Sequence, residues 1–133
     1  MRSSNHVFLT MLCLFVWSQA FSEEYGMAAI YSPRFEGSRT ANGEIFKHGQ
    51  YTASHKTFPF GSRVKVTRLD NGKWVIVRIN DRGPYVSNRV TDLSKVAAEK
   101  LGIASLSTEF EVKVEAVEDP GNRSEERRVG KEC

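Results

Sequence analysis

The chain has 133 residues, enough for one domain, with 19 basic and 16 acidic side chains. Setting aside Arg2 and the four bases and three acids of residues 123–133 leaves 14 basic and 13 acidic residues, a net charge of +1. A net charge this close to zero gives no reason to expect nucleic acid or an acidic membrane as a partner. Both cysteines, Cys13 and Cys133, lie in the chain ends, so the domain between them must fold by core packing without a disulfide.

The first twenty residues have the three parts of a secretory signal peptide. Arg2 supplies the positive region, residues 7–17 form an apolar run too short for a usual membrane span, and residues 18–20 end in a cleavage site. An uncleaved anchor is the alternative. Because Leu12 precedes Cys13 where a lipoprotein signal needs a small residue, we expect no lipid anchor. The protein is therefore expected to be exported, periplasmic or extracellular, without stable membrane insertion after cleavage.

The middle of the chain predicts mainly β-strands, because apolar and polar residues alternate in several short runs. An early strand is expected over residues 26–31, where small side chains suit close packing. A hairpin is expected from residues 63–67 and 74–79, with Asn71-Gly72 typical of a two-residue turn. Its second arm contains few polar residues, which predicts a strand buried on both faces.

One further strand and one helix complete the predicted elements. Residues 109–117 alternate cleanly, which predicts a strand whose inward side chains are Phe110, Val112, Val114 and Ala116. A short helix is expected up to Gly102, with Asp92 as its cap. Several short strands, one or two short helices and long polar loops favour a mainly β fold, a small closed barrel.

Three polar loops contain the candidate catalytic or binding residues, which are in chain order Glu44, His55, Lys56 and Asp81. Each residue has an ordinary alternative role. Asp81 and Arg82 can form a surface ion pair on an Asx turn, Glu44 can be an exposed acid, and His55 a hydrogen-bonded loop residue. His48 and His55 lack the paired spacing of a zinc site, and phosphate-binding glycine motifs are missing, so we expect neither metal nor cofactor.

Four stretches resemble the successive motifs of the rare lipoprotein A (RlpA-like) family: TANGE, SHKTFPFGSRVKVTRLDNGK, VRINDRGPYV and RVTDLSKVAAEKLG. The resemblance covers about residues 26–117 and implies a six-stranded double-psi β-barrel. Members of the family include lytic transglycosylases, so it also implies endolytic cleavage of MurNAc–GlcNAc bonds in peptidoglycan strands stripped of stem peptides. The product would be a 1,6-anhydroMurNAc end, and we expect a monomer to act on the glycan.

The resemblance assigns roles to individual residues of these motifs. Asp81 of NDRGP falls on the family's proposed catalytic acid, and Glu44 and His55 fall on its supporting catalytic residues. Substrate contacts are expected from the side chains around them: Tyr31, Thr40, Asn42, Lys56, Asn80, Arg82 and Tyr85.

Lytic transglycosylation needs one acid that gives a proton and later takes one back. We therefore expect Asp81 in a partly desolvated place or beside another carboxylate, with Glu44 the candidate. Arg82 is expected to point away, toward Asp92, because a close cation favours the ionised acid. The alternative is a non-catalytic module that binds or loosens wall polysaccharide, as in the more distant expansins and barwin proteins.

The end of the chain does not look like part of the domain. Residues 123–133, RSEERRVGKEC, resemble the in-frame translation of a sequencing-adapter oligonucleotide. We therefore expect one folded domain over residues 21–119 and a disordered tail over residues 120–133, of which the last eleven are an artefact.

Overall fold

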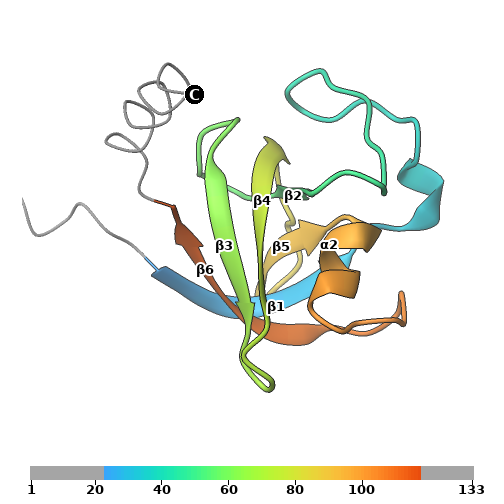
Figure 1. The fold of residues 1–133 in the computed structure, drawn as a ribbon. Coiled ribbons are helices and arrows are strands. Elements are labelled where there is room, and N and C mark those ends of the chain that lie inside the picture. Colours follow the sequence, from blue (N-terminus) through green and yellow to red (C-terminus); the bar gives the residue numbers. More distant parts are fainter. Residues whose placement is uncertain (1–22, 118–133) are drawn as a thin grey trace, which may run out of the picture.

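The computed structural model describes residues 23–117, which form a closed barrel of six strands (Figure 1). Around the barrel the strand order is β1-β5-β2-β4-β3-β6. The strands are β1 (Glu23–Ile30), β2 (Thr52–Ser54), β3 (Arg63–Arg68), β4 (Trp74–Asp81), β5 (Arg89–Leu93) and β6 (Phe110–Ala116). The expected mainly β, six-stranded barrel is confirmed.

Two short helical segments accompany the barrel. A 3₁₀ turn, η1 (Pro33–Phe35), follows β1, and a helix, α2 (Lys95–Lys100), follows β5. Within residues 23–117 no helix is long and apolar enough to cross a membrane. The expected signal peptide (1–20) and tail (120–133) lie outside the described residues.

Parallel pairing brings the end of β2 beside the end of β4. β1 pairs in parallel with β5, and β2 pairs in parallel with β4, whereas the other neighbouring strands are antiparallel. The register of β2 on β4 skips Asn80, so that Ser54 lies opposite Asp81. The next residue continues this contact, because the N–H of His55 donates to the carbonyl of Asp81 at 3.1 Å. Asp81 and His55 are therefore neighbours through the backbone.

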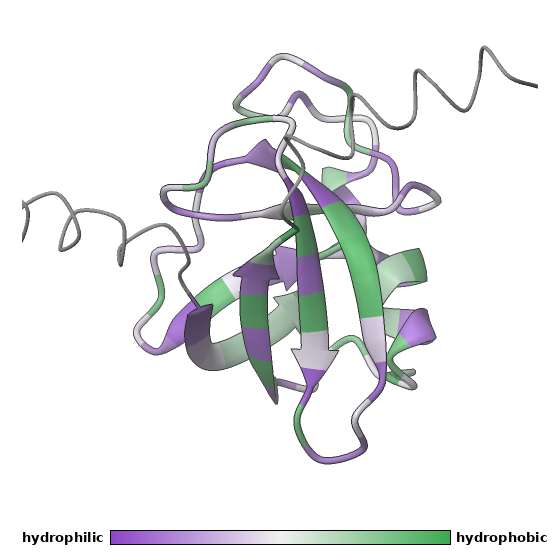
Figure 2. Cartoon of the chain, turned by 60° about the vertical axis from the view of Figure 1, so that its left-hand side comes forward, coloured by the Kyte–Doolittle hydropathy of each residue, from purple (hydrophilic) through white to green (hydrophobic). Residues whose placement is uncertain are grey.

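Alternate side chains of β3, β4 and β6 fill the barrel. The buried residues of these strands include Val64, Val66, Val75, Val77, Ile79, Val112 and Val114. Figure 2 shows the resulting bands of hydrophobic and hydrophilic residues along the strands. The prediction that β4 is buried on both faces is wrong, because its outward residues Trp74 and Ile76 are exposed and half-buried. Ala116 is also exposed, at the end of β6 where the core stops.

The β3–β4 hairpin is confirmed, but its turn is longer than the two residues expected. The N–H of Arg68 donates to the carbonyl of Lys73 at 2.8 Å, and the N–H of Gly72 donates to the carbonyl of Arg68 at 2.9 Å. A two-residue turn of this kind needs positive φ at both central residues. Here Gly72 has a positive φ of +76°, but Asn71 does not have a positive φ. The side-chain oxygen of Asn71 instead accepts a hydrogen bond from the N–H of Lys73 at 2.9 Å.

The helix begins later than expected, because the residues before it form β5. Asp92 lies inside β5 opposite Ala29, and Ser94 stands at the start of α2. Two hydrogen bonds tie β5 to β2: Thr91 Oγ1 donates to Ser54 O at 2.8 Å, and Asp92 N donates to Ser54 Oγ at 3.1 Å. Asp92 is therefore a strand residue whose backbone bonds to the neighbouring strands, and its expected role as a helix cap is wrong.

Gly26 marks a close approach of β1 to β5. A Cβ at this position would lie 2.5 Å from Val90 Cγ1 and 3.1 Å from the carbonyl of Asn88. We expect Gly26→Ala to lower the free energy of unfolding by about 1–3 kcal/mol, measured by urea denaturation, because the barrel must shift to admit a methyl group. Gly49→Ala is the matched control, since a Cβ at Gly49 meets nothing within 4 Å. Equal losses in the two variants would contradict this explanation.

Candidate active site

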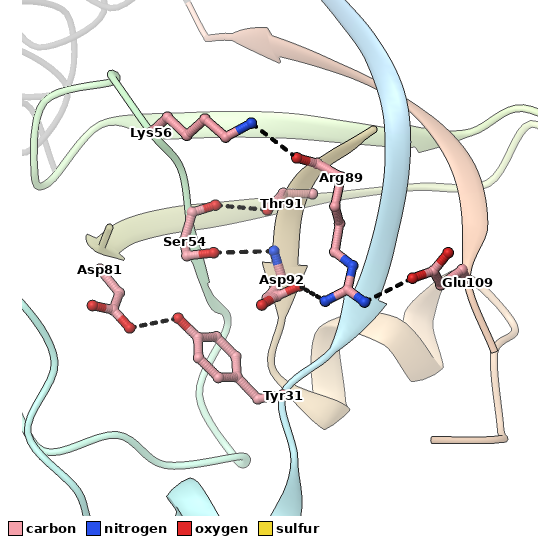
Figure 3. Close-up of polar contacts among 8 residues, drawn as sticks. All are labelled: Tyr31, Ser54, Lys56, Asp81, Arg89, Thr91, Asp92 and Glu109. Carbon is pink, nitrogen blue, oxygen red and sulfur yellow. Dashed lines mark hydrogen bonds and ion pairs between the residues drawn. The ribbon is translucent and has the colours of Figure 1, made fainter. Parts of the chain in front are cut away.

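Three donors hold the carboxylate of Asp81, the last residue of β4. The backbone N–H of Ala41 donates to Oδ1 at 2.8 Å, and the backbone N–H of Arg82 donates to the same oxygen at 2.9 Å. The Tyr31 hydroxyl donates to Oδ2 at 2.7 Å (Figure 3). The carboxylate is half-buried, so it is both fixed and open to a ligand. Because Ala41 and Tyr31 are remote from Asp81 in the sequence, the fold orients this side chain.

Glu44 is held by a separate set of three side chains. Arg78 Nη1 forms an ion pair with Glu44 Oε2, and Asn42 Nδ2 donates to the same oxygen at 3.0 Å. Asn80 Nδ2 donates to Oε1 at 3.1 Å. Hydrogen bonds from Arg78 first, then from Asn80 and Asn42, lower the pKa of Glu44 to about 2. Glu44 is therefore ionised at neutral pH, and its side-chain bonds go to these residues rather than to Asp81.

The same network closes the TANGE loop over the end of β4. Thr40 Oγ1 donates to Asn42 Oδ1 at 2.7 Å, which turns the amide nitrogen of Asn42 toward Glu44. The N–H of Asn42 donates to the carbonyl of Asn80 at 3.3 Å, next to Asp81. Glu44 thus anchors the loop that presents the N–H of Ala41. Glu44, the candidate for a second carboxylate beside Asp81, is instead paired with Arg78. Asp81 is half-buried, as the other expectation has it, and the carboxylate whose charge interacts with it is Asp92 on β5.

The depressed pKa of Glu44 predicts a pH-dependent contribution to stability. The folded pKa of about 2 lies below the ordinary value of 4.5, so the ionised side chain stabilises the fold above that value. This contribution is lost as the pH falls toward 2. Since 36% of the Glu44 side chain is exposed, we expect Glu44→Gln to cost at most about 1 kcal/mol at pH 7 and nothing near pH 2. Urea unfolding at both pH values measures this, and a pH-independent difference would contradict it.

Tyr31 is buried directly after β1, with 9% of its surface exposed. Its ring packs on Phe46 at 4.5 Å and on Phe35 at 5.9 Å between ring centres. Burial, and then the neighbouring Asp81 carboxylate, raise the pKa of Tyr31, so the phenol keeps its proton. Little of the ring is left for the substrate contact that the sequence analysis expected, and its hydroxyl faces Asp81 instead.

The imidazole of His55 faces Glu24 rather than the carboxylate of Asp81. Only 2% of His55 is exposed, and its ring stacks on Phe58 at 3.9 Å. Nδ1 accepts from the N–H groups of Thr57 and Phe58 at 3.1 and 3.0 Å. Nε2 therefore carries the proton and bonds to Glu24 Oε1. This arrangement shapes the chain that leaves β2, whose backbone contacts Asp81.

Arg82 does not reach Asp92 as expected. Its Nη1 donates to the carbonyl of His55 at 3.1 Å, and its guanidinium lies 4.0 Å above the ring of Phe60. Asp92 is paired with Arg89 at 3.4 Å instead. Arg82 touches Asp81 through its backbone N–H, so the simple surface ion pair between the two side chains is not seen.

The structure gathers most of the predicted residues around Asp81, but Lys56 stands apart. Lys56 Nζ donates to the carbonyl of Arg89 at 3.2 Å and points toward β5 (Figure 3). Tyr85 is 78% exposed on the turn after β4. Among residues 23–117, no group of three or more His, Cys, Asp or Glu side chains is placed to hold a metal ion.

Sequence reasoning missed Arg78, Glu24 and the N–H of Ala41. Arg78 had a readable signal, because it is a charge within the apolar run of β4, three residues before Asp81. Glu24 and the Ala41 N–H had none, since a carboxylate at the start of a strand and a backbone group look ordinary in the sequence.

A family model described as lytic transglycolase matches residues 23–115, and these residues include every side chain of the site. The chain belongs to this family. Relatives of this lytic transglycolase domain are named endolytic peptidoglycan transglycosylase RlpA, the family that the sequence motifs resemble. The chain is 59% identical over 80 residues to the probable enzyme of Synechocystis sp. and 55% identical over 93 residues to that of Pseudomonas aeruginosa.

These alignments cover 60% and 70% of this chain but 25% and 27% of the two relatives. The lytic transglycolase domain thus spans about a quarter of the length of these relatives. Among solved structures, Streptomyces papain inhibitor is similar with a TM-score of 0.56 at 22% identity, covering 73% of this chain and 96% of that one. At this identity the similarity concerns the fold alone. The resemblance to the RlpA-like family is confirmed by the family match.

Proposed function

We propose that the domain is an endolytic peptidoglycan lytic transglycosylase that cleaves MurNAc–GlcNAc bonds of glycan strands stripped of stem peptides. The observation that carries the proposal is the half-buried carboxylate of Asp81, held at the end of β4 by donors from three parts of the chain. The family match and the names of the relatives support the same activity.

In this proposal Asp81 acts first as an acid and then as a base. Protonated Asp81 gives its proton to the glycosidic oxygen while the bond from that oxygen to C1 of MurNAc breaks. The C6 hydroxyl oxygen then bonds to C1, and its proton passes to the Asp81 carboxylate. The product is a 1,6-anhydro ring, no water is consumed, and Asp81 ends protonated as it began. The second carboxylate that an ordinary glycosidase needs is not required here.

Glu44 and His55 are proposed to support this chemistry by holding the backbone around Asp81. Glu44 anchors the TANGE loop through Arg78, and His55 shapes the chain after β2. Contacts to the sugar are proposed for Asn42, Arg82 and Tyr85 near the end of β4. The contacts expected from Thr40 and Asn80 are not supported, because both residues are buried and bond to Asn42 and Glu44. No sugar contact is proposed for Tyr31, whose hydroxyl bonds to Asp81, or for Lys56, which bonds to the carbonyl of Arg89 on β5.

Product analysis tests the proposed reaction. The chain is incubated with peptidoglycan that an amidase has stripped of stem peptides, and soluble fragments are analysed by mass spectrometry. Fragments with anhydro ends, one water lighter than the reducing ends of hydrolysis, are expected. Fragments that have gained water would show a hydrolase and overturn the proposal. Untreated peptidoglycan serves as the comparison for the need to remove peptides.

A second candidate is a non-catalytic module that binds or loosens wall polysaccharide. The exposed rings of Tyr85 and Phe60, at 78% and 41%, favour it, because sugar-binding surfaces rely on aromatic side chains. Such a module would sediment with the glycan and release no fragments.

The place of action is proposed from the first twenty residues and from the relatives' substrate. We propose export through the signal peptide, followed by action as a monomer in the periplasm or outside the cell. Recovery of the protein only from the cytoplasm, or at the size of a dimer on gel filtration, would contradict this.

A further inference from the structure

The two carboxylate oxygens of Asp81 are bonded differently. Each oxygen of a carboxylate offers about two lone-pair directions for hydrogen bonds. Oδ1 uses both, because it accepts from the N–H groups of Ala41 and Arg82. At Oδ2, the donor found among the described residues is the Tyr31 hydroxyl, at 2.7 Å. Oδ2 therefore retains room for a proton, whereas Oδ1 does not.

We propose that Oδ2 of Asp81 is the oxygen that transfers the proton, and that Tyr31 is the positioning residue that aims and tunes it. This inference rests on the proposed transglycosylase function. It gives Tyr31 a role different from the substrate contact expected from the sequence, since the hydroxyl acts on the acid and not on the glycan.

The surroundings of Tyr31 hold its hydroxyl in place. The N–H of Tyr31 donates to the carbonyl of Leu93 at 3.0 Å, which extends the pairing of β1 with β5. Phe46 and Phe35 pack against the ring, and 9% of the residue is exposed. The raised pKa of Tyr31, caused first by burial and then by Asp81, keeps the phenol protonated. Tyr31 is therefore a fixed donor that does not itself supply the catalytic proton.

The hydrogen bond from Tyr31 changes in strength during the reaction. A donor binds an ionised carboxylate more strongly than a neutral carboxylic acid. The bond to Oδ2 therefore strengthens as the proton leaves for the glycosidic oxygen, and weakens when the C6 hydroxyl returns a proton. Without the Tyr31 hydroxyl, Asp81 releases its proton less readily and holds it to higher pH. The limb of the rate profile on which activity falls with rising pH should then move upward.

Other titratable or charged groups lie on the elements around this pair and must be kept constant. They are Asp92 on β5, His55 after β2, Glu44 in the TANGE loop and Arg82 after β4. Asp92 matters most, because its charge acts on both Tyr31 and Asp81, and burial raises the pKa of Asp92 itself. Asp92→Asn, alone and combined with Tyr31→Phe, separates its titration from the effect of the hydroxyl.

Tyr31→Phe tests the inference, since it keeps the ring in its aromatic contacts and removes the hydroxyl. We expect turnover to fall about 10- to 100-fold, with glycan binding unchanged. The falling limb of the pH–rate profile and the ¹³C NMR titration midpoint of the Asp81 carboxyl carbon should both move up by about one pH unit. Tyr25→Phe is the matched control, because that hydroxyl lies on β1 and the residue is 62% exposed. It should behave as the unchanged protein.

The two proposals can fail separately. An Asp81 midpoint that is unchanged in folded Tyr31→Phe, or that moves equally in Tyr25→Phe, would overturn the role of Tyr31. If the unchanged protein makes no anhydro product, the proposed function fails, while the NMR midpoint still decides whether Tyr31 controls Asp81. Near-UV circular dichroism checks folding. Should Tyr31→Phe unfold, Phe46→Leu loosens the same packing with the hydroxyl kept, and a midpoint shifted equally there would show that packing alone is responsible.

Discussion

Replacing Asp81 with Asn is expected to abolish the release of anhydro-ended fragments, with a loss of activity of about 10³-fold. The amide cannot give a proton to the glycosidic oxygen or take one from the C6 hydroxyl. It can still occupy the site, because its oxygen accepts from Ala41 and Arg82 and its nitrogen faces the Tyr31 hydroxyl, which can also accept. The loss should therefore be chemical, with folding intact. Mass spectrometry of fragments and a thermal unfolding curve measure the two properties.

Asp70→Asn provides the matched control for this loss. Asp70 lies on the turn between β3 and β4, where it pairs with Arg68 at 2.6 Å, at the opposite end of β4 from Asp81. It should release fragments at the unchanged rate. Fragments of equal yield from Asp81→Asn would show that another group is the acid. If no variant releases fragments and all sediment with the glycan, the wall-binding module is the correct function.

The parts of the fold that the sequence predicted well are those governed by local alternation. Val64 and Val66 of β3, and Val112 and Val114 of β6, alternate with polar residues and are buried as expected. The hairpin of β3 and β4 follows from the same pattern, because its partners are close in the sequence. Asp81 was expected at a strand end, and it is the last residue of β4.

The predictions that failed concern residues whose pairing partners are far away in the chain. β2 has three residues and lies in a polar stretch, so only its pairing with β4 and β5 makes it a strand. Asp92 has the position of a helix cap in the sequence, yet its backbone bonds to Ser54 and draws it into β5. Local propensity cannot anticipate such pairing, because a strand of this length gains its stability from its neighbours.

The site shows the same division between residue identity and residue partner. Motifs singled out Glu44, His55 and Asp81, but each side chain is held by a residue 30 or more positions away. Glu44 pairs with Arg78, Asp81 bonds to Tyr31, and His55 bonds to Glu24, at separations of 34, 50 and 31 residues. Composition does not say which base compensates which acid. Sequence therefore predicted which groups matter, and the fold determines whether each acts on substrate or on the backbone.

His55 allows this distinction to be tested with a large effect on stability. We expect His55→Ala to lower the free energy of unfolding by about 2–4 kcal/mol, because the N–H groups of Thr57 and Phe58 lose their acceptor and a buried ring is removed. Activity should fall with it, because a shift of the backbone at residue 55 would weaken the hydrogen bond from its N–H to the carbonyl of Asp81. Urea unfolding and fragment release measure both.

His55→Asn separates a structural imidazole from a catalytic one. The side-chain oxygen of Asn reaches the place of Nδ1 and can accept from the N–H groups of Thr57 and Phe58, as in an Asx turn. It cannot carry a proton as imidazole does. If His55 acts through the backbone, Asn should recover much of the stability and activity that Ala loses. A folded Asn variant as inactive as Ala would instead require the imidazole in the proton transfer, and the bond to Glu24 would then be the route that orients it.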